Sequence, residues 1–346
     1  MAYTSNFVLK IDNTKCGASD SSNFPMLFSG TYAGGAGIPD LRVIGSGGVV
    51  TNSSGFDIVF TSDAAGNNLL SWEIESYTGT TGAVVFWIKI PTLTHAVNTV
   101  IYMWAGNAAI TTFQGGSAGA AWDSSFAFVG HISTANPNLD SSLSPVAISS
   151  HTETSGTGQI DGCGLFSGSQ FMAWNPVNKL KITPSITLSA WVMPTVTPSG
   201  LAVIGHGSFD YYLLIGEAHA GDIAFYNGAG WKNTVAGVGV TKNVWNHIAV
   251  THDGTNDLFY LNGALVGTVA DAGVLPTSNN ALSVAVIQGG FSFYTGSIDE
   301  IHVASSIRSV DWLLSEYNNQ FSPSIFYTLT PANIFVPMCG AFGIGI

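Results

Sequence analysis

The stretch 245–263, WNHIAVTHDGTNDLFYLNG, decides the fold class of this chain. It holds two runs rich in aliphatic, aromatic and β-branched residues, 245–251 and 258–261, and each run leads into an Asp-Gly or Asn-Gly pair. Such pairs favour the positive φ angles that tight hairpin turns require. The stretch therefore predicts two antiparallel strands and the turn into a third.

Similar short runs, bounded by Gly, Asn, Asp and Ser, extend along the chain in both directions from this stretch. The clearest are 7–11, 56–60, 83–90, 99–104, 186–193, 201–204, 211–215, 222–226, 281–287 and 298–304. Their spacing is typical of β-sandwiches. One segment, 309–318, has helical periodicity, with Val310, Leu313, Leu314 and Tyr317 on one face. We therefore expect an all-β chain with a short C-terminal helix.

The length of 346 residues corresponds to about two domains. Strand periodicity is lost over 106–121, so we place a first domain at 1–113 and a second at 114–320. The tail, 321–346, is apolar and interrupted by prolines. Another subunit or the first domain must cover it, since exposing such a surface to water is costly. We expect a subunit contact, because the second domain and its helix are complete before the tail.

The charge balance excludes some classes of partner. The chain has 9 Lys and Arg against 21 Asp and Glu, for a net charge of −12. Too few cations are present to neutralise a run of phosphates, so neither nucleic acid nor an anionic membrane surface is expected as a partner. No run reaches the roughly 18–20 apolar residues of a spanning helix, so membrane insertion is not expected either. The N-terminus lacks the pattern of a secretory signal, and we interpret the three cysteines as buried thiols.

Two ordered sets of motifs resemble known families. The first set is similar to the β domain of unknown function that precedes laminin-G-like domains in bacterial, archaeal and phage surface proteins. Its motifs are 24–27 (FPML), 55–63 (GFDIVFTSD), 73–77 (EIESY), 86–91 (FWIKIP) and 101–107 (IYMWAGN). Val59 departs from the pattern, where the family usually has Arg.

The second set resembles the laminin-G-like, concanavalin A-like jelly roll, over about residues 122–320. Its motifs are 186–194 (ITLSAWVMP), 245–254, 259–263 and 296–301 (GSIDEI). The two resemblances together imply two β-sandwich domains, the second a jelly roll.

Catalytic patterns are weak, and we expect no enzyme. Glycosidases need two carboxylates on one face, and Glu73 and Glu75 could form such a pair, although turn or strand-edge carboxylates are the simpler interpretation. Asp299 and Glu300 are adjacent, so a regular strand would direct them to opposite faces. His247 and His302 lie in strand motifs, where we expect hydrogen bonds within the sandwich. No phosphate loop or nucleophile elbow is present.

The resemblance suggests two kinds of binding site. Concanavalin A-like folds hold glycans at rim loops, and the aromatic candidates here are Tyr211, Tyr212, Trp231 and Tyr294. Some also hold a structural Ca²⁺, for which Asp140 and Asp299 are the candidates. An equally good interpretation of these two aspartates is that they anchor turns through backbone N–H groups. No other cofactor is expected.

Two functions remain open. The first is a structural virion protein of a phage, such as a capsid decoration, head fibre or tail component on the virion surface. It would assemble with itself or with other virion subunits and expose a lectin-like domain for attachment to a host glycan. The alternative is a secreted or surface-attached bacterial protein for carbohydrate binding or adhesion.

Overall fold

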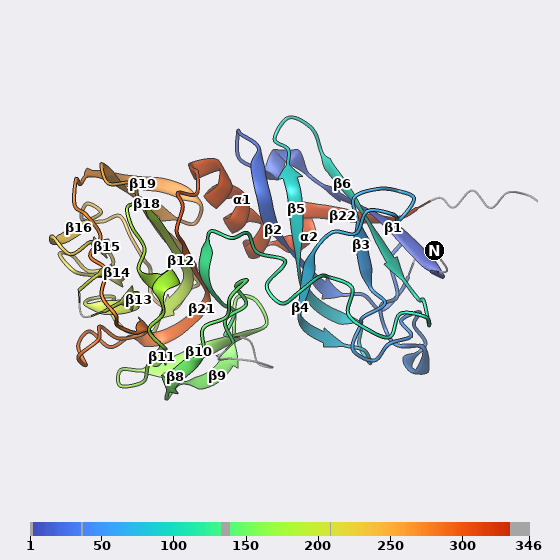
Figure 1. Ribbon diagram of the computed structural model, residues 1–346, viewed down its shortest axis with the longest axis horizontal. Helices are drawn as coiled ribbons and strands as arrows, with labels where there is room; N and C mark the ends of the chain where they lie inside the picture. Colours follow the sequence, from blue (N-terminus) through green and yellow to red (C-terminus); the bar gives the residue numbers. More distant parts are fainter. Residues whose placement is uncertain (1–2, 36, 133–138, 208, 333–346) are drawn as a thin grey trace, which may run out of the picture.

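The structure is a computed structural model, and it describes residues 3–35, 37–132, 139–207 and 209–332. Two β-sandwiches lie side by side, joined by a helix (Figure 1). This is the predicted all-β architecture. Among the described residues, no helix is both long and apolar enough to cross a membrane.

The first sandwich packs a four-stranded sheet against a three-stranded one. The four-stranded sheet has the order β22 (Tyr327–Pro331), β1 (Ser5–Ile11), β6 (Thr99–Ala105) and β3 (Val59–Thr61). The three-stranded sheet has the order β2 (Ser21–Thr31), β5 (Ala83–Leu93) and β4 (Trp72–Thr78). Rings of Phe28, Phe60 and Phe86 meet in the core, with centroids 5.6–6.4 Å apart. Edge-to-face packing of this kind stabilises the core beyond the area that it buries.

The second sandwich is a larger antiparallel jelly roll. One sheet has the order β19 (Ala264–Ala270), β18 (Asn256–Leu261), β17 (Asn246–His252), β12 (Ile186–Pro194), β21 (Thr295–Ala304), β10 (Gly162–Ser167) and β9 (Thr154–Thr157), with β7 (Phe126–Gly130) also on β21. The other has the order β16 (Trp231–Asn233), β15 (Ile223–Tyr226), β14 (Tyr211–Ile215), β13 (Leu201–His206), β20 (Leu282–Val284), β11 (Met172–Trp174) and β8 (Ile148–His151). Alternate residues of each strand fill the core between the sheets.

Strand β21 is irregular where its neighbour changes. Its first half pairs with β10, its second half pairs with β7, and Asp299 and Glu300 lie between the two ladders. The register with β12 also shifts here, and Glu300 has a φ of 47°. The bulge places the side chains of Asp299 and Glu300 on the same side of the strand. This follows from the two flanking residues, Ile298 and Ile301, whose side chains both enter the jelly-roll core. The expectation of opposite faces, which assumed a regular strand, is therefore wrong.

Helix α1 (Val310–Phe321) joins the two sandwiches (Figure 1). Ser309 caps its first turn by accepting a hydrogen bond from the Trp312 N–H. On one side the helix contacts β19, and on the other it contacts β2, where Asn319 bonds both backbone groups of Leu27. One apolar cluster runs from the first sandwich through the helix to the outer face of the jelly roll.

The chain beyond α1 belongs to the first sandwich. The short helix α2 (Pro323–Phe326) leads into β22, which pairs with β1. Phe326 is fully buried and stacks on Phe24. The first domain therefore covers part of the tail, Phe326 and Tyr327, while Ile325 stays 59% exposed. The expected subunit contact stays a prediction. Residues 333–346 lie outside the described part of the chain.

Candidate functional site

Three of the four aromatic residues expected to hold a glycan are core residues. Tyr211, Tyr212 and Tyr294 have no exposed surface. The hydroxyl of Tyr211 donates to the Leu180 carbonyl, and that of Tyr294 donates to the Ser297 carbonyl. The glycan prediction for these three residues is therefore wrong. Tyr211 and Tyr294 point into the core between the sheets. Tyr212 lies on the other face of β14, buried in a small apolar cluster against which Tyr226 and Trp231 pack.

Trp231 lies on the surface, in the edge strand β16, where it is partly exposed. Its ring packs edge-on against Tyr226 of β15, with the centroids 5.1 Å apart. Tyr226 in turn contacts Phe209, whose exposed fraction is 53% and whose centroid lies 5.4 Å away. We call Phe209, Tyr226 and Trp231 the aromatic surface. Sequence reasoning found Trp231 but missed Phe209, because an isolated Phe in a loop carries no periodic signal.

The outer face of the same sheet also carries a hollow of about 310 Å³. It lies over β11 and β20, and half-buried Phe171 and Phe293 line it together with Ser283 and Gln288. The Gln288 side-chain oxygen is buried without a hydrogen-bond partner in the described structure. Aromatic rings beside a few polar groups are typical of small-ligand sites.

Asp140 and Asp299, the two candidates for a calcium site, both accept hydrogen bonds from backbone N–H groups. Asp140 accepts hydrogen bonds from the N–H groups of Val129, Ser142 and Val146, and Lys179 lies 2.9 Å from its carboxylate. The lysine already supplies the positive charge that a cation would bring.

Asp299 accepts from the N–H groups of Ile160 and Glu300. These contacts are those expected from the alternative, that both aspartates anchor turns. Neither belongs to a group of three or more metal-ligating side chains within the described residues.

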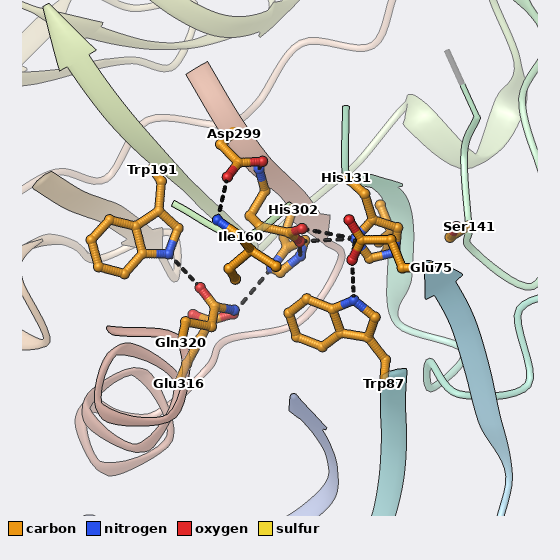
Figure 2. Close-up of polar contacts among 12 residues, drawn as sticks. Glu75, Trp87, His131, Ser141, Ile160, Trp191, Asp299, His302, Glu316 and Gln320 are labelled. Atoms are coloured by element: carbon orange, nitrogen blue, oxygen red, sulfur yellow. Dashed lines mark hydrogen bonds and ion pairs between the residues drawn. The ribbon is translucent and has the colours of Figure 1, made fainter. Parts of the chain in front are cut away.

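A second candidate site lies between the two sandwiches. We call Glu73, Glu75, His131, Glu300, His302 and Glu316 the interdomain cluster (Figure 2). The glutamates at 73 and 75 come from β4, and a register shift between Ile74 and Ser76 leaves Glu75 unpaired with β5. His131 directly follows β7, and Glu316 comes from α1.

His131 lies at the centre of the interdomain cluster. Its Nδ1 is 2.9 Å from one Glu300 oxygen and 3.6 Å from Glu75, while its Nε2 is 3.7 Å from Glu73. The imidazole ring stacks on Trp87, whose Nε1 donates to Glu75 at 2.8 Å. Because the imidazole separates Glu73 from Glu75, these two carboxylates do not form the facing pair of a glycosidase.

Close polar contacts continue from Glu300 into helix α1, and the one between His302 Nδ1 and Glu316 is a hydrogen bond. His302 Nε2 lies 3.3 Å from Glu300, and His302 Nδ1 lies 3.0 Å from Glu316. His247 Nε2 is 3.6 Å from the other Glu316 oxygen. His247 and His302 thus face the joint between the two domains. The sequence had led us to expect that they make hydrogen bonds inside the jelly roll.

Burial and neighbouring charges separate the pKa values of this cluster. Burial opposes the charged form of His131, but the Glu300 and Glu75 carboxylates outweigh it and raise the pKa of His131 well above its usual value. Burial also raises the pKa of Glu75 well above its usual value. Burial also favours a higher pKa for Glu300, but the neighbouring His131 outweighs burial, so the pKa of Glu300 is lowered from its usual value. The pKa of His247 falls to about 4, because burial dominates there.

Two family models match the chain. Residues 54–133 match a domain of unknown function, DUF2341, and residues 166–313 match the concanavalin A-like lectin/glucanases superfamily. The chain therefore combines a domain of unknown function with a lectin-type jelly roll, in the order that the sequence motifs predicted. No curated protein matched the sequence.

Several solved structures resemble part of the chain at low identity and with TM-scores below 0.5. Domain 4 of AbnA, an extracellular arabinanase from Geobacillus stearothermophilus solved with arabinotriose, is 14% identical with a TM-score of 0.46; the match covers 56% of this chain and 98% of that one. The ligand-binding domain of botulinum neurotoxin serotype D, solved with N-acetylneuraminic acid, is 16% identical with a TM-score of 0.46. That match covers 59% of this chain and about half, 53%, of the toxin domain.

Proposed function

We propose that this protein is a non-catalytic carbohydrate-binding protein that holds a glycan on the outer face of its seven-stranded sheet. The observation that carries the proposal is the aromatic surface, in which three rings from β15, β16 and the loop before β14 lie in contact and partly exposed. Sugar rings present apolar C–H faces, and partly exposed aromatic rings offer them a rigid contact of low conformational entropy. The lectin-type family match supports this class of function.

A neutral glycan fits this chain better than an anionic one. The net charge of −12 repels anions, and only 9 lysine and arginine residues are available to bind them. Within the hollow, which lies on the same outer face two strands away from the aromatic surface, the Ser283 hydroxyl and the Gln288 amide can pair with sugar hydroxyls. We therefore expect neutral oligosaccharides to bind and sialylated ones to bind more weakly.

Screening the full chain against an array of neutral and anionic glycans tests the proposal. We expect signals for neutral glycans that fall in both Tyr226→Ala and Trp231→Ala. Phe321→Ala is the matched control, because it removes an exposed ring (55%) from helix α1, away from the seven-stranded sheet. Equal signals from all three variants would contradict the proposed site.

The placement on a phage virion stays a prediction. It depended partly on the tail as a subunit contact, and in the described part of that tail Phe326 is buried in its own chain and β22 pairs with β1. Oligomerisation, and the absence of catalysis, also stay predictions. A secreted or surface-attached adhesion protein would use the aromatic surface in the same way.

A further inference from the structure

Three metal-binding side chains converge from three elements at the domain joint. Glu75 of β4, His131 after β7 and Glu300 of β21 are all buried, and one ligand atom of each lies within 4.8 Å of those of the other two. Figure 2 shows the Glu75 carboxylate beside the His131 ring, and one Glu300 oxygen lies 2.9 Å from His131 Nδ1. The convergence depends on two β-bulges, since Glu75 and Glu300 each occupy the irregular position of its strand.

One ligand atom in this group has no partner. Glu75 Oε1 is buried and makes no hydrogen bond in the described structure, whereas Trp87 binds its Oε2. A buried carboxylate oxygen without a partner is costly, and a cation would satisfy it. In the described structure, the ion-pair partners of Glu75 and Glu300 are the imidazoles of His131 and His302, and neither carboxylate pairs with a lysine or arginine.

Each of the three side chains also has a polar neighbour behind it, and the contact of Trp87 with Glu75 is a hydrogen bond. Trp87 donates to Glu75 at 2.8 Å, His302 lies 3.3 Å from Glu300, and Glu73 lies 3.7 Å from the far nitrogen of His131. A carboxylate behind a ligating histidine is a recurrent feature of protein metal sites, where it fixes the ring and its tautomer.

We propose that Glu75, His131 and Glu300 bind a divalent transition-metal ion, with Zn²⁺ the first candidate, that clamps the two sandwiches together. One imidazole nitrogen and carboxylate oxygens are ligands that Zn²⁺ takes readily. Ca²⁺ and Mg²⁺ are excluded as preferred ions, because both favour sites made of oxygen alone. The ion can enter from a solvent-open hollow lined by Glu75 and Asp161.

The test uses the full chain, purified without a metal-affinity step. The metal is removed with a chelator, and Zn²⁺ is then titrated calorimetrically into wild type, Glu75→Gln, His131→Gln and His206→Gln. His206 is the control, because it forms a buried pair with Asp210 in the jelly roll, 2.9 Å apart, without a third ligand. Glu75→Gln keeps the shape of the side chain and an acceptor for Trp87.

We expect about one Zn²⁺ per chain in wild type and His206→Gln, with affinity at least about tenfold lower in Glu75→Gln and His131→Gln. Binding should also raise the melting temperature of wild type, but not that of Glu75→Gln. The absence of stoichiometric binding of Zn²⁺, Mn²⁺, Co²⁺ or Ni²⁺ by folded wild type would overturn the proposal. So would unchanged affinity in Glu75→Gln.

A second measurement covers the case in which both variants misfold. X-ray absorption of zinc-loaded wild type should show a first shell of nitrogen and oxygen with the multiple scattering of a single imidazole. Sulfur ligands, or two or more imidazoles, would place the ion elsewhere and overturn the assignment.

Discussion

Trp231 and Tyr294 are both aromatic residues in β-rich sequence, yet their environments give them different roles. Trp231 sits on an edge strand with its ring partly exposed, whereas Tyr294 is fully buried with its ring 6.3 Å from that of Phe166. The sequence around each shows only that the residue lies near a strand. Which face of the strand points outward depends on the register of the whole sheet. Side-chain roles were therefore predicted less well than strands.

Tyr294→Ala should destabilise the protein by about 3–5 kcal/mol, as expected when a large buried ring is deleted. Urea denaturation monitored by circular dichroism measures this change. Tyr294→Phe, which loses only the hydrogen bond to the Ser297 carbonyl, should cost about 1 kcal/mol. If Tyr294→Ala were as stable as wild type but had lost glycan binding, this prediction would be contradicted and Tyr294 would belong to the binding site.

Asp257 provides a pH-dependent contribution to stability in the jelly roll. Burial raises its pKa to about 6, although His252, with Nδ1 2.6 Å from its carboxylate, opposes the shift. The folded chain thus holds the Asp257 proton more tightly than the unfolded chain does. Lowering the pH from 7 to 5 should stabilise wild type by about 0.5–1 kcal/mol more than Asp257→Asn, after allowance for partial solvent screening. Urea melts at both pH values measure the difference, and equal pH dependence in the two proteins would contradict it.

At the scale of elements, helix α1 does more than end the jelly roll. The sequence predicted a helix over 309–318, and the structure has it over Val310–Phe321. Its periodicity could not reveal that the polar Asn319 and Glu316 face a second domain, because helical patterns identify only the apolar face. The two bulges that bring Glu75 and Glu300 to His131 were missed for a similar reason. A bulge adds one residue to a strand and leaves little trace in a single sequence.

Asn319→Ala should destabilise the protein by about 2–4 kcal/mol, since it removes both partners of the buried Leu27 backbone groups. Asn318→Ala is the control, because Asn318 makes one partly buried bond, to the Lys15 carbonyl. Its cost should be about 0.5–1.5 kcal/mol. Chemical denaturation of both variants measures the two costs, and equal values would show that α1 does not depend on β2.

At the scale of the molecule, two domains recognised separately from sequence form one packed body. The apolar cluster of the first sandwich continues through Trp312 and Leu313 to Ala249 and Tyr260 of the jelly roll. Motif order predicted both folds, since each motif lies within one sandwich. The joint could not be predicted, because its residues come from segments more than a hundred positions apart, such as Leu27 and Asn319.

The shared core predicts that the chain unfolds in a single cooperative transition. Differential scanning calorimetry should show one peak, with calorimetric and van't Hoff enthalpies that agree. Two domains with a small polar interface would unfold independently. Two separated peaks would show that the joint contributes little to stability.

The central claim, that the aromatic surface binds a glycan, is tested most directly by calorimetric titration of the full chain with a neutral oligosaccharide selected on the array. Wild type and Phe321→Ala should bind with equal affinity. Trp231→Ala should lose about 1–3 kcal/mol of binding free energy while its melting temperature stays within a few degrees of wild type. Unchanged affinity in a folded Trp231→Ala protein, or no binding of any neutral glycan by wild type, would contradict the claim.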